Sequence, residues 1–336
     1  MYTTTVTTRH EEKKKDENHR KLEEDVEPVP LAGKRTPARL RIIWRNVIGI
    51  IVLHFLAVYG FVNGYRDAKL WTWIWNIVYG VVAGFGITAG AHRLWAHKSY
   101  SAKTPLRIFL AYLYCMAGQT HFYKWIRDHR THHRYTETCA DPHDATRGFF
   151  FSHIGWLMVK RDPAVKEYGS KIDMSDIAAD PVIKFFDKYY EVIMLTLCFA
   201  MPILVPILAW DETWFISVHA ALIRYVWSLH ATFIVNSFAH MWGNRPYNRR
   251  VKPTENPAVS FFALGEGWHN YHHSFPWDYK AAELGAYGLN PTTGFIELMA
   301  RVGLAYDLKT PREELVDRTI ARKGDGTSSL WGRRRC

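Results

Sequence analysis

The sequence predicts an all-α membrane protein with four transmembrane helices in two hairpins and a helical cap on the cytosolic side. Four apolar runs each approach the roughly 20 residues that cross the hydrocarbon core of a bilayer. The loops that join these runs in pairs are only a few residues long. The long charged segments lie before the first pair, between the pairs and after the second pair.

The first hairpin is predicted from two neighbouring apolar runs. Residues Val47 to Val62 are apolar apart from His54, and Trp71 to Ala91 form the second run. The segment between them, around Tyr65 to Leu70, is long enough only for a turn. The pair therefore predicts a helix that enters the membrane and a helix that returns.

The second hairpin comprises Val192 to Trp210 and Trp214 to about Val235, joined by Asp211, Glu212 and Thr213. Pro202 and Pro206 predict a kink in the first of these helices, because proline removes a backbone donor. Four buried helices of a soluble protein are the alternative interpretation. The length of the runs and their lack of charge favour membrane spans.

The polar middle of the chain, roughly His92 to Tyr190, contains one modest apolar stretch from Leu106 to Gly118. It is short for a span, so we expect it to lie along the membrane interface or to dip in. All long polar regions follow an even number of spans and therefore share one side of the membrane. They hold nearly all Lys and Arg, which places that side in the cytosol.

This parity defines three regions of the chain. Residues 1–40 are charged and lack apolar periodicity, which predicts a disordered cytosolic head. Residues 41–310 form the four-span domain with its cytosolic cap, and residues 311–336 form a cytosolic tail. Both ends are expected in the cytosol.

The charge of the chain bears on its partners. The net charge is +11, but Lys and Arg are not arranged as in a helix or strand that reads nucleic acid. We therefore expect no nucleic acid partner, and membrane lipid or an anionic substrate instead. The four cysteines show no paired spacing, so the sequence predicts no disulfide framework.

Histidine is abundant, and eight of the seventeen histidines fall in three clusters. The clusters are His92 and His97; His129, His132 and His133; and His269, His272 and His273. Spacing of i, i+3, i+4 in the second and third clusters places their imidazoles on one stripe of a helix. The i, i+5 pair of the first cluster converges only if the span ends or distorts between its members.

Clustered imidazoles in this number predict a histidine-rich di-metal site in the cap. Imidazole suits Zn, Fe, Cu or Ni, and no paired cysteines indicate a structural zinc site. The carboxylates of Asp128, Asp141 and Glu266 are candidates to orient the rings. Isolated histidines such as His54 and His219 are interpreted as structural.

At these clusters the sequence resembles the membrane fatty acyl-CoA desaturases, the stearoyl-CoA desaturase-like family, and especially its insect delta-9 and delta-11 types. The resemblance extends from about Ile42 to Gly326. Its most specific segments are GITAGAHRLWAHKSY from Gly86, RDHRTHHRYTETCADPHDATRGFFFSHIGWL from Arg127, VNSFAHMWGNRPY from Val235 and GEGWHNYHHSFPWDY from Gly265.

The resemblance implies two Fe(2+) ions and their ligands. It assigns His92, His97, His129, His133 and His272 to one iron. It assigns His132, His240, His269 and His273 to the other, with a water held by Asn236. The i, i+4 relation of Asn236 and His240 would place both on one helix face.

The resemblance also implies a tunnel for a fatty acyl-CoA. Contacts to the CoA headgroup are expected from Arg45, Asn46, Arg127, Asp128, Lys160 and Arg161, although ordinary membrane-surface charge remains the alternative for the basic residues. The tunnel wall would include Gln119, Trp125, Trp156, Thr232 and Phe233. The closed end, which sets chain length, would be formed by Asn76, Tyr79, Gly80 and Ala83. His230-Ala231-Thr232-Phe233 departs from the family's usual Asn-Ala-Thr-Trp.

The implied reaction introduces a cis double bond, most often delta-9, into a saturated acyl-CoA with O2. An unactivated methylene has no acidic proton, so a metal must supply the oxidant. Electrons would come from cytochrome b5 and its NADH-dependent reductase at the endoplasmic reticulum membrane. Lys252-Pro253-Thr254-Glu255 is similar to the tetrapeptide of insect delta-9 enzymes. Delta-11 or another position, a related membrane di-iron hydroxylase, and a non-catalytic metal-binding membrane protein are the alternatives.

Overall fold

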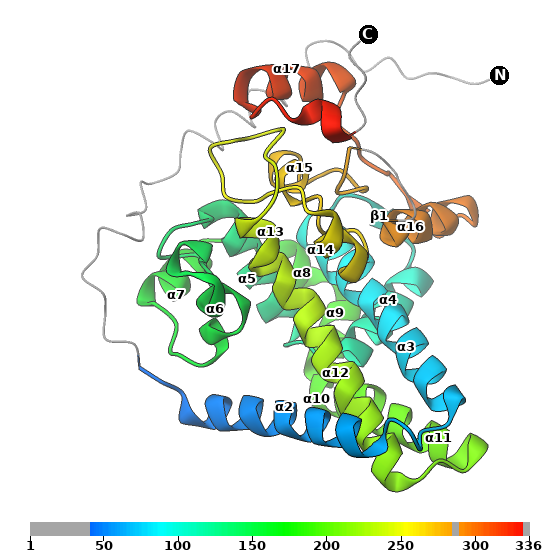
Figure 1. Ribbon diagram of the computed structural model, residues 1–336. Coiled ribbons are helices and arrows are strands. Elements are labelled where there is room, and N and C mark those ends of the chain that lie inside the picture. Colours follow the sequence, from blue (N-terminus) through cyan, green and yellow to red (C-terminus); the bar gives the residue numbers. More distant parts are fainter. Residues whose placement is uncertain (1–40, 284–288, 332–336) are drawn as a thin grey trace, which may run out of the picture.

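The prediction of four membrane-spanning helices is confirmed. The computed structural model describes residues 41–283 and 289–331 (Figure 1). The predicted disordered head, residues 1–40, lies outside the described residues. Helices long and apolar enough to cross a membrane run over Trp44–Gly64, Leu70–Ala96, Tyr190–Trp210 and Trp214–Met241.

Only the first span is regular from end to end. It is α2 (Trp44–Gly64), and the second span is α3 (Leu70–Phe85) continued by a π-helix, η2 (Gly86–Ala96). The third is α10 (Tyr190–Met194), the π-helix η5 (Leu195–Ala200) and α11 (Met201–Trp210). The fourth is α12 (Trp214–Asn236), interrupted at Ser237 and followed by α13 (Phe238–Met241).

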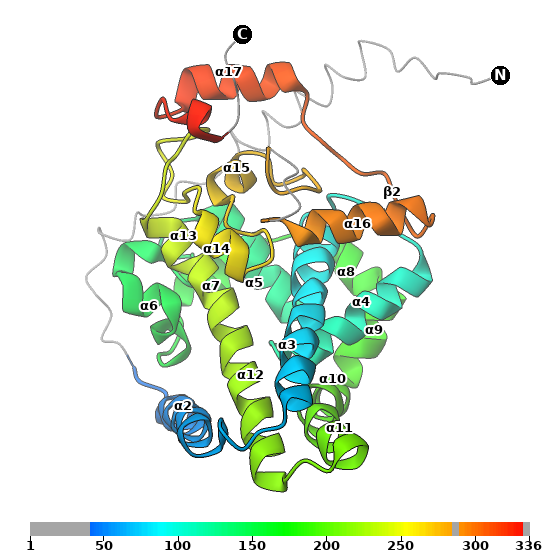
Figure 2. The same cartoon turned by 45° about the vertical axis from the view of Figure 1, so that its right-hand side comes forward.

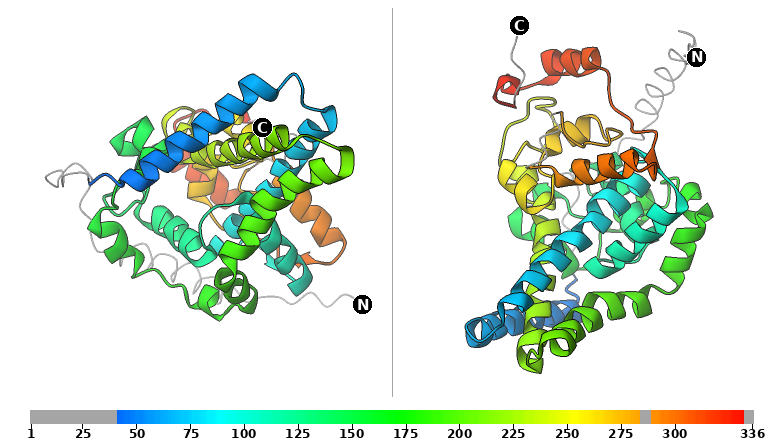
Figure 3. Two further views of the ribbon diagram at one scale, coloured as in Figure 1. Left: turned by 90° about the horizontal axis from the view of Figure 1, so that it is seen from below. Right: turned by 90° about the vertical axis from the view of Figure 1, so that its right-hand side faces the viewer.

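The two hairpin loops meet at the end of the molecule away from the cap (Figure 2). The buried carboxylate of Glu212 accepts a hydrogen bond from the backbone N–H of Lys69 at 2.9 Å and from the Thr72 hydroxyl at 2.6 Å. Asp211 ends α11 in the left-handed conformation, with φ of 53°. Glu212 therefore joins the turns of both hairpins. The two hairpins also contact each other along their length, because α2 packs along α12 (Figure 3).

The third span contains a π-helix, η5, directly before α11 and Pro202, and the kink at Pro202 and Pro206 stays a prediction. Pro202 has no N–H, so the carbonyl of Cys198 lacks its usual helical donor. The buried guanidinium of Arg224, on α12, donates to that carbonyl. A charged side chain inside the membrane region thereby satisfies backbone that proline leaves without a partner.

The cap consists of short elements between and after the hairpins (Figure 1). Between them lie β1 (Ser101–Ala102), α4 (Thr104–Ala117), α5 (Phe122–Tyr135), η3 (Ala145–Arg147), α6 (Phe149–His153), η4 (Gly155–Leu157), α7 (Pro163–Gly169), α8 (Ser175–Ala179) and α9 (Pro181–Lys188). After them lie α14 (Pro257–Phe262), α15 (His269–Ser274), α16 (Pro291–Arg301), β2 (Ala305–Tyr306), α17 (Glu313–Lys323) and η6 (Ser328–Trp331). The two short strands pair antiparallel.

The modest apolar stretch forms α4, which packs against η2 and buries Leu110 and Tyr114. It ends at Gly118 with φ of 62°, a conformation that glycine adopts without strain. The contact with η2 is close, because a Cβ on Gly86 would lie 2.1 Å from the backbone nitrogen of Tyr114. This packing fixes the part of the second span that carries the first histidine cluster.

The predicted tail contains a helix that packs on the cap. Val316 of α17 is buried in a cluster with Tyr247, Tyr271 and Phe275. The backbone N–H of Arg249 also donates to the carbonyl of Lys323, at 2.9 Å. The described part of this segment is therefore tied to the helix that carries the third histidine cluster.

Candidate metal centre

Nine imidazoles gather in two groups inside the cap. One group contains His92, His97, His129, His133 and His272, and the other contains His132, His240, His269 and His273. Within each group, the nitrogen atoms that face one another all lie within 4.8 Å. The rings of His133 and His273 stack at 4.1 Å, so the two groups adjoin. These are the two sets that the family resemblance implies.

The π-helix η2 brings the first cluster together. In an α-helix, residues five apart are offset by about 140° around the axis. In a π-helix each N–H donates to the carbonyl five residues back, and the N–H of His97 does so to His92 at 3.0 Å. The two rings consequently lie 4.8 Å apart. Both conditions that the sequence named are met, because the span is distorted into a π-helix and ends at Ala96, between the two histidines.

The helix break at Ser237 corrects the argument for His240. Asn236 ends α12 and His240 lies on α13, so an i, i+4 relation on one continuous helix does not apply. His240 nevertheless joins the second group, where its Nε2 lies 3.0 Å from Nε2 of His269. Asn236 lines the cavity beside that group.

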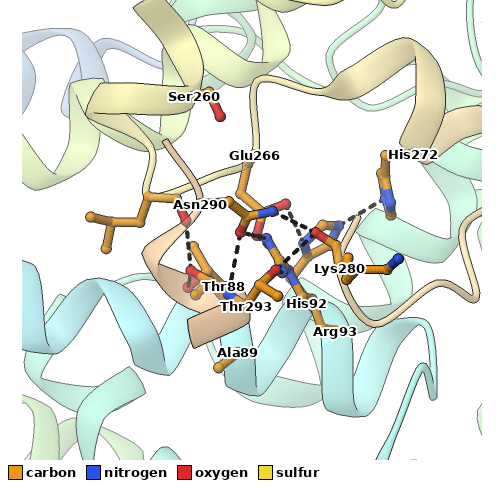
Figure 4. Close-up of polar contacts among 12 residues, drawn as sticks. Thr88, Ala89, His92, Arg93, Ser260, Glu266, His272, Lys280, Asn290 and Thr293 are labelled. Carbon is orange, nitrogen blue, oxygen red and sulfur yellow. Dashed lines mark hydrogen bonds and ion pairs between the residues drawn. The ribbon is translucent and has the colours of Figure 1, made fainter. Parts of the chain in front are cut away.

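A buried carboxylate orients His92. The Nδ1 atom of His92 lies 3.0 Å from the carboxylate of Glu266, which also accepts a hydrogen bond from the fully buried Arg93 at 3.1 Å. Figure 4 shows Arg93 held further by Asn290 and Thr293, each at 3.1 Å. With Nδ1 of His92 facing the carboxylate, its Nε2 faces the first group and lies 3.0 Å from Nε2 of His272. Sequence reasoning missed Arg93, whose role depends on residues far along the chain.

Asp141 orients His132 in the same way, with 2.9 Å between its carboxylate and Nδ1. Although burial alone would raise the pKa of Asp141, the imidazoles of His132 and His143 and the backbone N–H of Glu137 together outweigh it and lower that pKa. Asp128 does not orient a histidine as predicted. Its carboxylate binds Arg161 at 2.6 Å and Arg127 at 3.4 Å.

Six of the clustered imidazoles are held neutral. Burial, followed by repulsion from neighbouring imidazoles, keeps the pKa well below its ordinary value for His97, His129, His133, His269, His272 and His273. Neutral imidazoles offer lone pairs, and lone pairs that converge this closely repel one another unless a cation lies between them. The arrangement therefore fits a metal ion in each group.

A largely apolar cavity of about 500 Å³ extends from both groups into the membrane region. Its inner end reaches His92, His129, His132 and His269, and its walls come mainly from α3 and α12. Its volume lies in the range of small-molecule sites. The cavity opens the metal centre to a long apolar ligand.

Several predicted tunnel residues line this cavity, and others do not. Trp125, Thr232, Asn76 and Gly80 line it. Phe233 does not line it and is buried against His153, Trp156 and His230. Gln119 and Trp156 have buried side-chain nitrogens without a hydrogen-bond partner among the described residues. For Tyr79 and Ala83 a place at the closed end stays a prediction: the Tyr79 hydroxyl binds the Leu197 carbonyl, and Ala83 lies in the core. Gly84, which sequence reasoning missed, lines the cavity with Ile77 and Val81.

The predicted headgroup residues come together on one part of the cap. Backbone hydrogen bonds join Ile43 to Met158 and Lys160 to Arg41, each at 2.8 Å, and the Asn46 side chain donates to the Leu157 carbonyl at 2.8 Å. Arg45 and Asn46 at the start of α2 therefore lie near the segment that contains Lys160 and Arg161. Asp128 connects this segment to Arg127 on α5.

Four spans, two groups of converging imidazoles and an apolar cavity that reaches both groups define a histidine-rich membrane protein with a candidate metal centre. The sequence model of the fatty acid desaturase family matches residues 68–282. The chain belongs to the fatty acid desaturase family.

Individual relatives are similar over most of their length. The chain is 52% identical to an acyl-CoA Delta-9 desaturase of Acheta domesticus, over 89% of this chain and 83% of the relative. It is 48% identical to an acyl-CoA Delta(11) desaturase of Trichoplusia ni, over 93% and 90%. It is 47% identical to the stearoyl-CoA desaturase of Homo sapiens, over 93% and 87%.

Proposed function

We propose that this protein is an acyl-CoA desaturase that introduces a cis double bond into a saturated fatty acyl-CoA. The observation that carries the proposal is the cavity, which is apolar along the spans and ends at both histidine groups. An acyl chain in it would present a fixed pair of carbons to the metal centre. Selectivity among equivalent methylenes is then a matter of position.

Two iron ions are the proposed cofactors. One would be held by His92, His97, His129, His133 and His272, and the other by His132, His240, His269 and His273 with a water on Asn236. Bound iron supplies, with O2, the oxidant that an unactivated methylene requires. Among the residues of this chain, Glu266 would orient the ligand His92 and Asp141 would orient the ligand His132.

The CoA headgroup is proposed to lie outside the cavity, against Arg45, Asn46, Arg127, Asp128, Lys160 and Arg161. Guanidinium groups suit phosphates because they donate paired hydrogen bonds. Asp128 supports this arrangement, because its ion pairs hold Arg127 and Arg161 next to each other. Trp156 and Gln119 are proposed to contact the substrate, because each has a buried side-chain nitrogen without a hydrogen-bond partner in the described part of the chain.

Delta-9 is the proposed position of the double bond, and delta-11 is the alternative. Identity supports delta-9 only slightly, since the Delta-9 and Delta(11) relatives are 52% and 48% identical. The protein is further proposed to lie in the endoplasmic reticulum membrane with both ends in the cytosol. Its proposed electron donors are cytochrome b5 and the NADH-dependent reductase.

Expression in a desaturase-deficient yeast tests the proposal. Fatty acid analysis should find a new cis-monounsaturated acid, and its double-bond position decides between delta-9 and delta-11. A hydroxylated fatty acid would assign the chain to the hydroxylase alternative. Metal analysis of the purified protein should find about two iron ions per chain, and stoichiometric zinc with activity in the absence of iron would contradict the assignment.

A further inference from the structure

Two polar side chains from the spans line the apolar cavity away from the histidine groups. They are Asn76 of α3 and Arg224 of α12. Only 3% of Asn76 and 5% of Arg224 is exposed, and the two helices pack against each other (Figure 2). An amide or a charged group at this depth of a membrane protein is costly and usually serves a function. Among the described residues, each of the two keeps one polar atom without a partner.

The amide of Asn76 uses its nitrogen and leaves its oxygen unused. Nδ2 donates to the carbonyl of Thr72, one helical turn earlier, at 2.9 Å. Because a carbonyl can only accept, this contact fixes which end of the amide faces Thr72. Oδ1 is buried and has no hydrogen-bond partner in the described part of the chain. Asn76 therefore brings an unused acceptor to the wall of the cavity.

The guanidinium of Arg224 leaves one donor unused. Its terminal nitrogens donate to the carbonyl of Cys198 and, at 3.4 Å, to that of Met116. Its central carbon lies over the ring of Tyr79, 5.4 Å from the centroid. Nε is buried and has no hydrogen-bond partner in the chain as described. Because a guanidinium keeps its proton, this N–H requires an acceptor from another source.

Small residues leave room beside both unused atoms. Gly80 follows Asn76 by one helical turn, and it lines the cavity together with Ala220. A Cβ on Gly80 would lie 3.4 Å from Cγ of Arg224 and 3.9 Å from its Cδ, the atom bonded to Nε. The unused donor and the unused acceptor therefore adjoin the same stretch of the cavity, about one turn apart along α3.

A hydroxyl group is complementary to such a pair, because it can accept from one partner and donate to the other. We propose that Asn76 and Arg224 form a hydroxyl-binding subsite of the cavity, whose ligand is the terminal hydroxyl of an ω-hydroxyacyl-CoA. The inference rests on the proposed function and names a second substrate class for it. A chain with its reacting carbons at the histidine groups would extend along the cavity toward this subsite. Beneath a chain that ends in a methyl group, water would make the same two hydrogen bonds.

Calorimetric binding of acyl-CoA pairs to the full-length protein tests the subsite. The two members of a pair have equal chain length, from about 12 to 18 carbons, and end in a methyl or a hydroxyl group. A hydroxyl without partners in an apolar cavity should weaken binding by roughly 10-fold or more. At the length that brings the hydroxyl to the subsite, the hydroxyl form should bind at least as tightly as the methyl form. A uniform penalty at every length would mean that the two side chains hold water only, and it would overturn the proposal.

Asn76→Leu tests the acceptor, because leucine has a similar volume and no polar atom. The variant should bind the matching ω-hydroxyacyl-CoA roughly 10-fold more weakly and the methyl form within about twofold of the unmodified protein. Asn63→Leu is the matched control. Asn63 of α2 also donates to a carbonyl one turn earlier, that of Tyr59 at 2.8 Å, but it is exposed and does not line the cavity.

The length preference should persist in Asn63→Leu and vanish in Asn76→Leu. A preference that persists in Asn76→Leu, or that both variants lose, would overturn the role of Asn76. The length series on the unmodified protein decides even if Asn76→Leu does not fold.

The binding result is independent of desaturation. A preference at one chain length in a protein that forms no double bond would refute the proposed function and leave the subsite in place. Desaturation of methyl-ended chains, combined with a uniform penalty for the hydroxyl, would refute the subsite alone. Absence of binding by every acyl-CoA of the series would overturn both.

Discussion

At the scale of single residues, Glu255 shows how the third histidine cluster is held. Its buried carboxylate accepts a hydrogen bond from the backbone N–H of Tyr271 at 2.8 Å, at the start of α15. Free N–H groups at a helix start require such a partner. Burial nevertheless raises the pKa of Glu255 to about 8, so the group is protonated at neutral pH.

This raised pKa predicts that stability falls as pH rises. The folded protein binds the Glu255 proton up to about pH 8, whereas the unfolded chain releases it near the ordinary value of 4.5. The contribution is thus complete below pH 4.5 and is lost as pH rises to about 8, with a size on the order of a few kcal/mol. Melting temperatures between pH 5 and 9 should fall in the unmodified protein and less steeply in Glu255→Gln. Equal slopes would contradict the assignment.

The metal ligands give the second residue-scale prediction. His132→Ala and His272→Ala should each abolish desaturation and reduce bound iron, because each removes a nitrogen from one of the two groups of converging imidazoles. Neither residue lies in a span, so membrane insertion should be unchanged. Iron content, products and membrane fractionation measure this, with His219→Ala as the control. Loss of the protein from the membrane would instead indicate a structural role.

At the scale of elements, length and apolar character were sufficient to predict the spans, because the bilayer imposes both. The i, i+3, i+4 stripe of α5 was also predictable, although its members divide between the two metal groups. The π-helix η2 was not, because its hydrogen bonding depends on packing against α4 and α5. The contacts of Arg93, Gly84 and His54 could not be predicted from the sequence either, because their partners lie far away along the chain.

Gly86 tests whether packing of η2 on α4 positions the first histidine cluster. A Cβ there would lie 2.1 Å from the backbone of α4, where nothing flexible can yield. Gly86→Ala should therefore destabilise the protein by roughly 1–3 kcal/mol, as overpacking does, and lower its iron content. Gly49→Ala is the control, because a Cβ at Gly49 meets nothing within 4 Å. Equal melting temperatures and iron contents in the two variants would refute this role for the contact.

The walls of the cavity predict chain-length selectivity. Gly80 lines the α3 side of the cavity, and a Cβ there would make only an ordinary contact with Arg224, at 3.4 Å. An 18-carbon chain should therefore be accepted at least as well as a 16-carbon one. Gly80→Trp should fill the space and shift products toward shorter acids. Ala83→Trp should instead destabilise the protein, because Ala83 lies in the core. A Gly80→Trp enzyme with lower activity but an unchanged ratio of 16- to 18-carbon products would favour close helix packing as the role of this glycine.

At the scale of the whole molecule, the cap and the hairpin turns lie at opposite ends (Figure 2). The cap side holds the described start of α2, the middle of the chain and α17. There the backbone of Lys160 pairs with that of Arg41, and α17 packs on α15. The turns at Lys69 and Glu212 belong to the other side. Each hairpin adds two spans between one cap segment and the next. All segments that contribute to the metal centre therefore lie on the same side of the membrane.

This arrangement predicts that both ends of the chain face the cytosol and both hairpin turns face the lumen. A glycosylation acceptor inserted at the exposed Asp67 should be modified, because the lumen holds the glycosylating enzyme, whereas an acceptor added after Cys336 should not. The positive-inside rule gives the same orientation, since basic residues collect on the cap side. A shift in electrophoretic mobility that glycosidase removes is the measurement. Modification after Cys336 would mean that the orientation in the membrane is inverted or that the number of spans is odd. An inverted orientation would place the metal centre on the side away from the proposed cytosolic electron donors.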